Sequence, residues 1–175
     1  AFGFFETGIT HSRFSANIPM HVIEGSSDGP VLVVQAGLSG LEIEPALILP
    51  KVVQEIDANE LSGTLILVPL MNTSGFEFEQ INSVWDDKNL NELGRGLEAG
   101  TVSEQMVHKY YSEVISKADA LLDIHSGSQW SYHRYAGVYN VGETTKSRSM
   151  AIDVGLSQVL INQPEDKSMA FEAAK

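Results

Sequence analysis

Apolar residues in this chain gather in short runs between polar turns, and the lengths of these runs predict strands. Three runs are almost continuous and rich in branched side chains: residues 30–35 (PVLVVQ), 64–70 (TLILVPL) and 120–124 (ALLDI). Such runs are typical of strands covered on both faces, as in a parallel sheet between helices. Residues 18–24 (IPMHVIE) also indicate a strand, and the phenylalanines within residues 1–18 suggest short, partly buried strands.

Helical spacing of apolar residues marks two segments between these strands. The clearest pattern covers residues 101–117, where Thr101 and Glu104 form a capping box at the start. An earlier helix is expected over residues 44–56. Pro50 lies inside that helix and should kink or split it, because proline lacks the backbone N–H and clashes with the preceding turn.

The remaining segments alternate in the same way. Residues 135–141 and 158–161 indicate strands, whereas residues 144–155 and 168–175 indicate helices. Residues 71–100 are polar and without periodicity, and a structureless stretch of that length in a compact domain is usually functional. The order of elements predicts an α/β fold with a mixed, mostly parallel sheet and helices on both faces.

Length and composition agree with one soluble α/β domain. The chain has 175 residues, of which 43% are hydrophobic and 19% charged, so we expect residues 1–175 to form a single domain. No stop signal follows the last helix, which suggests a chain truncated at its C-terminus. No run approaches the roughly 20 apolar residues of a membrane helix, and no signal peptide is recognisable.

Charge and cysteine content restrict the partners. The net charge is −12 with no basic cluster, so neither nucleic acid nor an anionic membrane surface is an expected partner. The absence of cysteine excludes disulfides and thiolate metal ligands, and it fits a cytoplasmic protein. An acidic surface does not exclude an anionic substrate, because local charges in a pocket can override the overall charge.

Polar side chains follow three of the predicted buried strands. Ser39 and Glu42 come after the first strand, Asn72 after the second, and His125 directly after the third, with Asp123 two residues before it. Ligands of open α/β sheets bind outside the carboxyl ends of the strands. A carboxylate and an imidazole from separate strands suit a catalytic zinc ion, and Asp123 could orient the imidazole if it shares the same strand face.

Four motifs, in order, resemble the succinylglutamate desuccinylase/aspartoacylase family. Residues 18–42 are similar to the opening strands that lead into G-x-H-G-x-E, and residues 69–76 (PLMNTSGF) are similar to P-x-x-N-x-x-G-F. Residues 86–91 (DDKNLN) are similar to D-G-x-D-L-N, and residues 123–127 (DIHSG) are similar to D-L-H-T/S. Each motif alone is unspecific, but together they cover nearly all of the chain in the right order and spacing.

The resemblance implies a zinc-carboxypeptidase-like fold and zinc-dependent hydrolysis of the amide bond in N-acyl amino acids. Glu42 and His125 stand at two of the family's three zinc-ligand positions. Ser39 stands where the third ligand, a histidine, is expected, and a neutral hydroxyl is a poor zinc donor. The resemblance therefore implies that zinc is bound weakly or not at all. The family's catalytic glutamate has no equivalent before Lys175.

The resemblance also suggests substrate-binding residues. Asn91 would position the substrate, Asn72 lies in the matching asparagine motif, and Arg95 could pair with a substrate carboxylate. Glu92 stands where the family has an arginine, which reverses the charge offered to an anionic substrate. Ile81 falls near another arginine position of the family.

Other interpretations of the same residues stay open. His125 could be a structural histidine, and Glu42 could be a first-turn acid stabilised by the helix dipole. Ser39 at a strand–turn–helix apex could be a nucleophile, although Leu41 replaces the glycine expected two residues later. His133 follows the site strand and could approach it. A non-catalytic binding module and a metallocarboxypeptidase-like peptidase are the alternative functions.

Overall fold

The computed structural model describes residues 1–127, 134–139, 141, 144–162 and 167–175. The strands are β1 (Phe2–Phe5), β2 (Thr10–His11), β3 (Phe14–Ser15), β4 (Ile18–Glu24), β5 (Ser27–Ala36), β6 (Ser62–Val68), β7 (Ala120–Ile124), β8 (Tyr135–Tyr139) and β9 (Gln158–Asn162). The α-helices are α1 (Ile43–Glu55), α2 (Thr73–Glu77), α3 (Val102–Glu113), α4 (Thr145–Asp153) and α5 (Met169–Ala174), and the 3₁₀ helices are η1 (Leu90–Glu92) and η2 (Ile115–Lys117).

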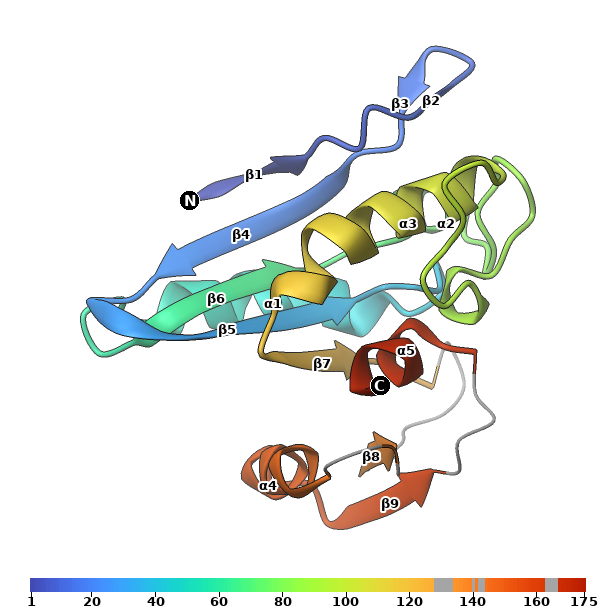
Figure 1. The fold of residues 1–175 in the computed structure, drawn as a ribbon. Helices are drawn as coiled ribbons and strands as arrows, with labels where there is room; N and C mark the ends of the chain where they lie inside the picture. Colours follow the sequence, from blue (N-terminus) through green and yellow to red (C-terminus); the bar gives the residue numbers. More distant parts are fainter. Residues whose placement is uncertain (128–133, 140, 142–143, 163–166) are drawn as a thin grey trace.

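A five-stranded mixed sheet forms the centre of the fold, with the order β1-β4-β6-β5-β7 (Figure 1). β5 pairs in parallel with both β6 and β7, whereas β4 is antiparallel to β1 and β6. The predicted strands over residues 18–24 and 120–124 are confirmed with the same bounds. The strand expected over residues 64–70 begins and ends two residues earlier. The mixed α/β sheet is confirmed.

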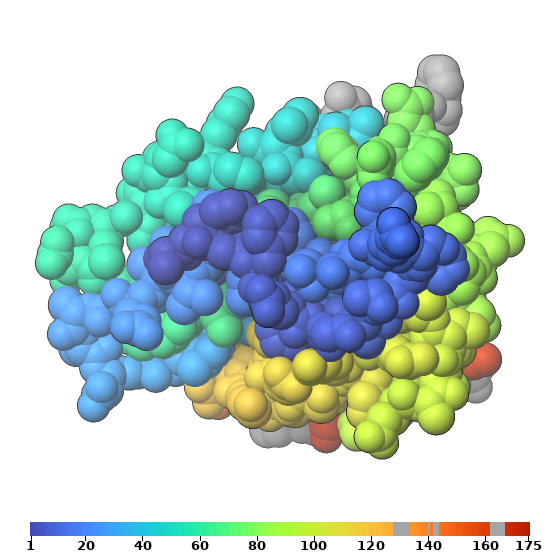
Figure 2. Space-filling model, turned by 90° about the horizontal axis from the view of Figure 1, so that it is seen from above, coloured from blue at the N-terminus to red at the C-terminus, as the bar shows by residue number. Residues whose placement is uncertain are grey.

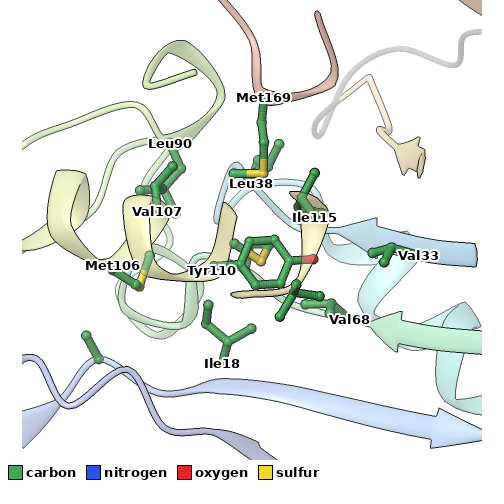
Figure 3. Close-up of a cluster of buried hydrophobic side chains, with 13 residues drawn as sticks. Ile18, Val33, Leu38, Val68, Leu90, Met106, Val107, Tyr110, Ile115 and Met169 are labelled. Carbon is green, nitrogen blue, oxygen red and sulfur yellow. The ribbon is translucent and has the colours of Figure 1, made fainter. Parts of the chain in front are cut away.

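Helices cover both faces of this sheet. On one face Leu49 of α1 packs with Leu65 and Leu67 of β6. On the other face Tyr110 of α3 lies in a larger core with Val33, and Figure 3 shows this core. These residues leave water almost completely, and apolar burial of this kind is the main favourable contribution to folding.

Pro50 was expected to kink or split this helix; α1 is a single helix that runs through Pro50, so it is not split. Proline in a helix interior removes one intrahelical hydrogen bond. Leu49 and Val53 lie four residues apart and pack against the same sheet face, one on each side of Pro50. We infer that this packing holds both halves in one helix.

The long polar segment over residues 71–100 contains α2 and η1, so the expectation of a structureless stretch was wrong. Its elements are short and begin with side-chain caps. Asn72 accepts from the backbone N–H of Gly75 at 2.8 Å, and Asn89 accepts from that of Asn91 at 3.1 Å. Local side chain–backbone bonds of this type replace the apolar periodicity that reveals longer helices.

The C-terminal part forms a small second sheet in which β8 and β9 pair in parallel, with α4 beside it (Figure 1). At the opposite side of the molecule the N-terminal residues spread over the surface (Figure 2), where Phe2, Phe4 and Phe14 are exposed. Within the described ranges, none of the helices is long and apolar enough to cross a membrane.

Asp86 connects the long segment to the start of α3. Its Oδ2 accepts from the backbone N–H of Ser103 at 2.8 Å, and its Oδ1 accepts from the Ser103 hydroxyl at 2.7 Å. Burial raises the pKa of Asp86, but hydrogen bonds from Thr101 and Ser103 outweigh burial and hold this pKa below its usual range. The ionised carboxylate therefore acts as a cap for α3.

We predict that Asp86→Asn lowers the free energy of unfolding at pH 7 by about 1 kcal/mol, the usual value for a lost helix cap. Because the folded-state pKa is lowered, this stabilisation is complete above the unfolded pKa of about 3.9. It disappears as the pH falls through the folded value. Urea unfolding from pH 7 to pH 3 should show the two proteins converging at low pH. Asp87→Asn is the matched control, since Asp87 Oδ1 accepts from the exposed side chain of Asn82 at 2.9 Å and makes no described bond to α3. An equal effect of both changes would contradict the prediction.

Candidate functional site

The candidate site lies at the carboxyl ends of β5 and β7. After β5 the chain turns at Gly37, whose φ of +68° disfavours other residues. A Cβ at Gly37 would also lie 2.8 Å from a side-chain carbon of Leu70, so the turn packs closely on the segment that follows β6. Glu42 then sits at the N-cap position of α1, and His125 is the first residue after β7.

The structure brings Glu42 and His125 into direct contact. Nδ1 of His125 lies 3.1 Å from Oε2 and 3.3 Å from Oε1 of Glu42. On the other side of the ring, Nε2 lies 3.2 Å from Oδ2 of Asp123. The imidazole is thus held between two carboxylates, and we call this arrangement the His125 clamp. The side chains of Glu42 and Asp123 are 11% and 7% exposed, whereas that of His125 is 39% exposed.

The two carboxylates determine the charge of the imidazole. Burial lowers the pKa of His125, but hydrogen bonds and charges from Asp123 and Glu42 outweigh it and raise this pKa to about 10. Near neutral pH the imidazole is therefore a cation that donates from both nitrogens. A metal ion on Nδ1 would have to displace a proton from that nitrogen.

Glu42 and His125 fit two ligands of one zinc ion. Two donors bonded at about 2.0–2.2 Å to a tetrahedral ion lie roughly 3.3–3.6 Å apart, close to the separation of Nδ1 and Oε1. Asp123 contacts the other ring nitrogen, Nε2, and this is the contact that a carboxylate makes when it orients a zinc-binding histidine. The third donor is missing from the pair, and among residues that the structure describes no group of three His, Cys, Asp or Glu side chains could hold a metal ion.

Ser39 lies in the same turn as Glu42, whose backbone N–H donates to the Ser39 carbonyl at 3.2 Å. The Ser39 hydroxyl accepts from the backbone N–H of Leu41 at 3.3 Å. This contact uses the hydroxyl as a local turn group. No described contact joins Ser39 to His125, which a serine nucleophile activated by this histidine would need.

The three predicted substrate-binding residues lie outside the His125 clamp. Asn72 is buried, and its side chain caps α2 and donates to the Ile81 carbonyl at 3.1 Å. Asn91 lies in η1, and its Oδ1 is buried without a partner among the described residues. Arg95 forms an ion pair with Glu172, with Nε 2.9 Å from Oε2. The positive charge expected for a substrate carboxylate is therefore already paired.

Sequence reasoning gave no role to two polar residues near the clamp. Glu44 of α1 accepts from the Ser126 hydroxyl at 2.8 Å, a second link between the start of α1 and the end of β7. Gln35 is fully buried at the end of β5. The available signal was a glutamine within a run of otherwise apolar strand residues. His133, which the sequence allows to approach the site, lies outside the described residues.

Comparison with known proteins places the chain in a family. The sequence profile of the succinylglutamate desuccinylase/aspartoacylase catalytic domain matches residues 28–175. The N-alpha-acetyl-L-2,4-diaminobutyric acid deacetylase of Halomonas elongata is 30% identical over 112 residues, which is 64% of this chain and 32% of that protein.

Two solved structures share the fold over 99% of this chain. An aspartoacylase family protein from Mesorhizobium loti superimposes with a TM-score of 0.82 at 21% identity, and this chain covers 56% of it. The product-bound ectoine utilization protein EutE from Ruegeria pomeroyi gives a TM-score of 0.81 at 22% identity, with 55% of that chain covered. This chain thus spans about a third of the curated relative and about half of the solved structures. It belongs to the succinylglutamate desuccinylase/aspartoacylase family.

Proposed function

We propose that this chain is the part of a deacylase-type protein that binds a divalent metal ion and a small N-acyl amino acid, with the metal site weakened by Ser39. The observation that carries the proposal is the His125 clamp. It joins a carboxylate and an imidazole from two different strand ends at the edge where α/β proteins bind ligands. A structural histidine would need neither a second carboxylate behind it nor a position at this edge.

Zinc would be held by Glu42 and by Nδ1 of His125, and it would polarise the amide carbonyl and lower the pKa of a bound water. Asp123 would fix the imidazole through Nε2. Amide hydrolysis also requires a positioned proton-transfer group. No such role is assigned to a described residue, so hydrolysis by the whole protein is part of the proposal and not of the observed geometry.

A binding module without catalysis is the second candidate. Two observations favour it: Ser39 replaces a ligand in the motif, and the Arg95 side chain is paired with Glu172. A hydrolase of anionic substrates needs a third metal ligand and a free cation for the substrate carboxylate. A site that only binds a small molecule can function without either of them.

Charge at the site favours some N-acyl amino acids over others. Glu42 and Glu44 lie at the start of α1, and Asp123 lies beside His125. The H. elongata relative is described as acting on an acetylated diaminobutyric acid, which carries an amine in addition to its carboxylate. We propose that the substrate is a zwitterion of this type and not an acyl-amino acid with several negative charges.

We predict that Nα-acetyl-diaminobutyrate binds at least about tenfold more tightly than N-succinylglutamate, because each extra negative charge is repelled by the carboxylates of the site. Isothermal titration calorimetry of both compounds with the same protein measures the ratio. Repeating the titration at high salt is the control, since screening should reduce the difference. Equal affinities at low salt would argue against the proposed substrate class.

Metal affinity should respond strongly to Ser39. We predict that Ser39→His tightens zinc binding by at least about 100-fold, because a third protein ligand should matter no less than the outer-shell groups whose loss costs 10–100-fold. Competition with a chromophoric chelator measures the affinity. Ser39→Gln is the matched control: it has similar bulk without an imidazole and should leave the affinity unchanged. Equal zinc uptake by all three proteins would exclude a degenerate zinc site.

Hydrolytic activity separates the two candidates. We expect the 175-residue chain to release no amino acid from N-acyl amino acids, with or without added zinc, because a missing proton-transfer group alone typically costs ~10²–10⁴ in rate. An amine-release assay checks this. Zinc-dependent release would show that the chain completes a working site despite Ser39. If chelators do not reduce the release of amino acid but Ser39→Ala abolishes it, the result would favour Ser39 as a nucleophile.

A further inference from the structure

Three buried polar side chains lie just inside the His125 clamp with hydrogen-bonding atoms that have no partner in the described ranges. These atoms are both side-chain amide atoms of Gln35, the hydroxyl of Tyr110 and Oδ1 of Asp123. Gln35 and Tyr110 are 0% exposed. An unpaired polar group in such a place costs more stability than an ordinary hydrogen bond contributes, so folded proteins rarely keep one without a use.

The sheet register brings these groups together. Gln35 and Asp123 are Cα partners in the parallel pairing of β5 with β7. Val33 and Leu121, each two residues earlier, pack in the same core as Tyr110. Because side chains alternate along a strand, Gln35 and Asp123 point to that same face.

Tyr110 reaches toward this pair from α3. Figure 3 shows its hydroxyl directed away from Met106, toward the side where Ile115 and Val33 lie. Burial raises the pKa of the Tyr110 hydroxyl above its usual range, and the negative charge of Asp123 raises it further.

The hydrogen-bonding capacities of the three groups are complementary. Tyr110 and Gln35 each offer a donor, and the free Oδ1 of Asp123 is an acceptor. Oδ2 of the same carboxylate already holds Nε2 of His125. A carboxylate that is held at both oxygens keeps its plane fixed, and it therefore fixes the imidazole as well.

We propose that Tyr110 and Gln35 are positioning residues of the metal site, which donate hydrogen bonds toward Oδ1 of Asp123 through one buried water. They act through Asp123 on the orientation of His125 and touch no reacting atom. The inference rests on the proposed function in one respect, namely that His125 is a metal ligand. The hydrogen bonds themselves do not depend on a metal.

Zinc affinity tests the positioning role. In the Ser39→His chain we expect Tyr110→Phe and Gln35→Met each to weaken zinc binding about tenfold, in the range of other outer-shell changes. Both effects should vanish when Asp123→Asn is already present, because the two residues act through that carboxylate. Tyr111→Phe is the matched control: the Tyr111 hydroxyl donates to the Glu172 carbonyl at 3.0 Å, so its loss should not change the affinity.

Exchange of the His125 Nε2 proton with water, followed by NMR in the metal-free chain, is the second measurement. It should accelerate about tenfold in Tyr110→Phe and in Gln35→Met and stay unchanged in Tyr111→Phe. If Ser39→His takes up no zinc, then the metal part of the proposed function fails, and proton exchange alone decides the positioning role. Unchanged exchange and affinity in both variants would overturn the inference. An equal loss with and without Asp123→Asn would also overturn it, because that result indicates packing.

Discussion

The parallel pairing of β5 with β7 is the constraint on which the candidate site depends. Because carboxyl ends of neighbouring parallel strands meet at one edge, this pairing places Glu42 beside His125 across 83 residues of sequence. Both strands carry apolar residues on both faces, so a slip of one residue would not expose their apolar side chains. It would, however, separate Gln35 from Asp123 and move His125 away from Glu42. The apolar residues of β5 and β7 therefore do not determine the register between the two strands. The polar residues at the strand ends do.

Apolar runs in the sequence located most strands of the sheet, because a strand covered on both faces shows itself by continuous branched residues. They failed where structure depends on side chain–backbone bonds. α2 and η1 are three to five residues long and start from asparagine caps, so neither can show a helical period. The effect of Pro50 was overestimated for a related reason: local propensity carries no information on the packing of Leu49 and Val53 against the sheet.

The site shows the same division. The motifs pointed to Glu42 and His125 as a pair, and their contact agrees with that expectation, although the roles as metal ligands stay a prediction. Sequence could not show that Arg95 is paired with Glu172, since those residues are 77 positions apart and only the docking of α5 brings them together. Nor could it show that Gln35 is buried beside Asp123, because the register between β5 and β7 is not visible in either strand alone.

The His125 clamp is satisfied without a metal ion, and this has a consequence for Ser39. The imidazolium donates from Nδ1 to Glu42 and from Nε2 to Asp123, so neither the ring nor Glu42 requires an ion to be stable in its place. Zinc would have to displace the Nδ1 proton, and a raised His125 pKa makes that displacement harder at neutral pH.

A third strong ligand would favour the metal in the competition between zinc and the proton, and serine does not supply one. Ser39 and the two carboxylates would thus act in the same direction, since each would weaken zinc binding at Glu42 and His125. A ligand that provides its own donor atom, such as the carboxylate of an acyl-amino acid, could compensate for the missing third ligand. Metal and substrate would then bind cooperatively, with each raising the affinity for the other by the same factor.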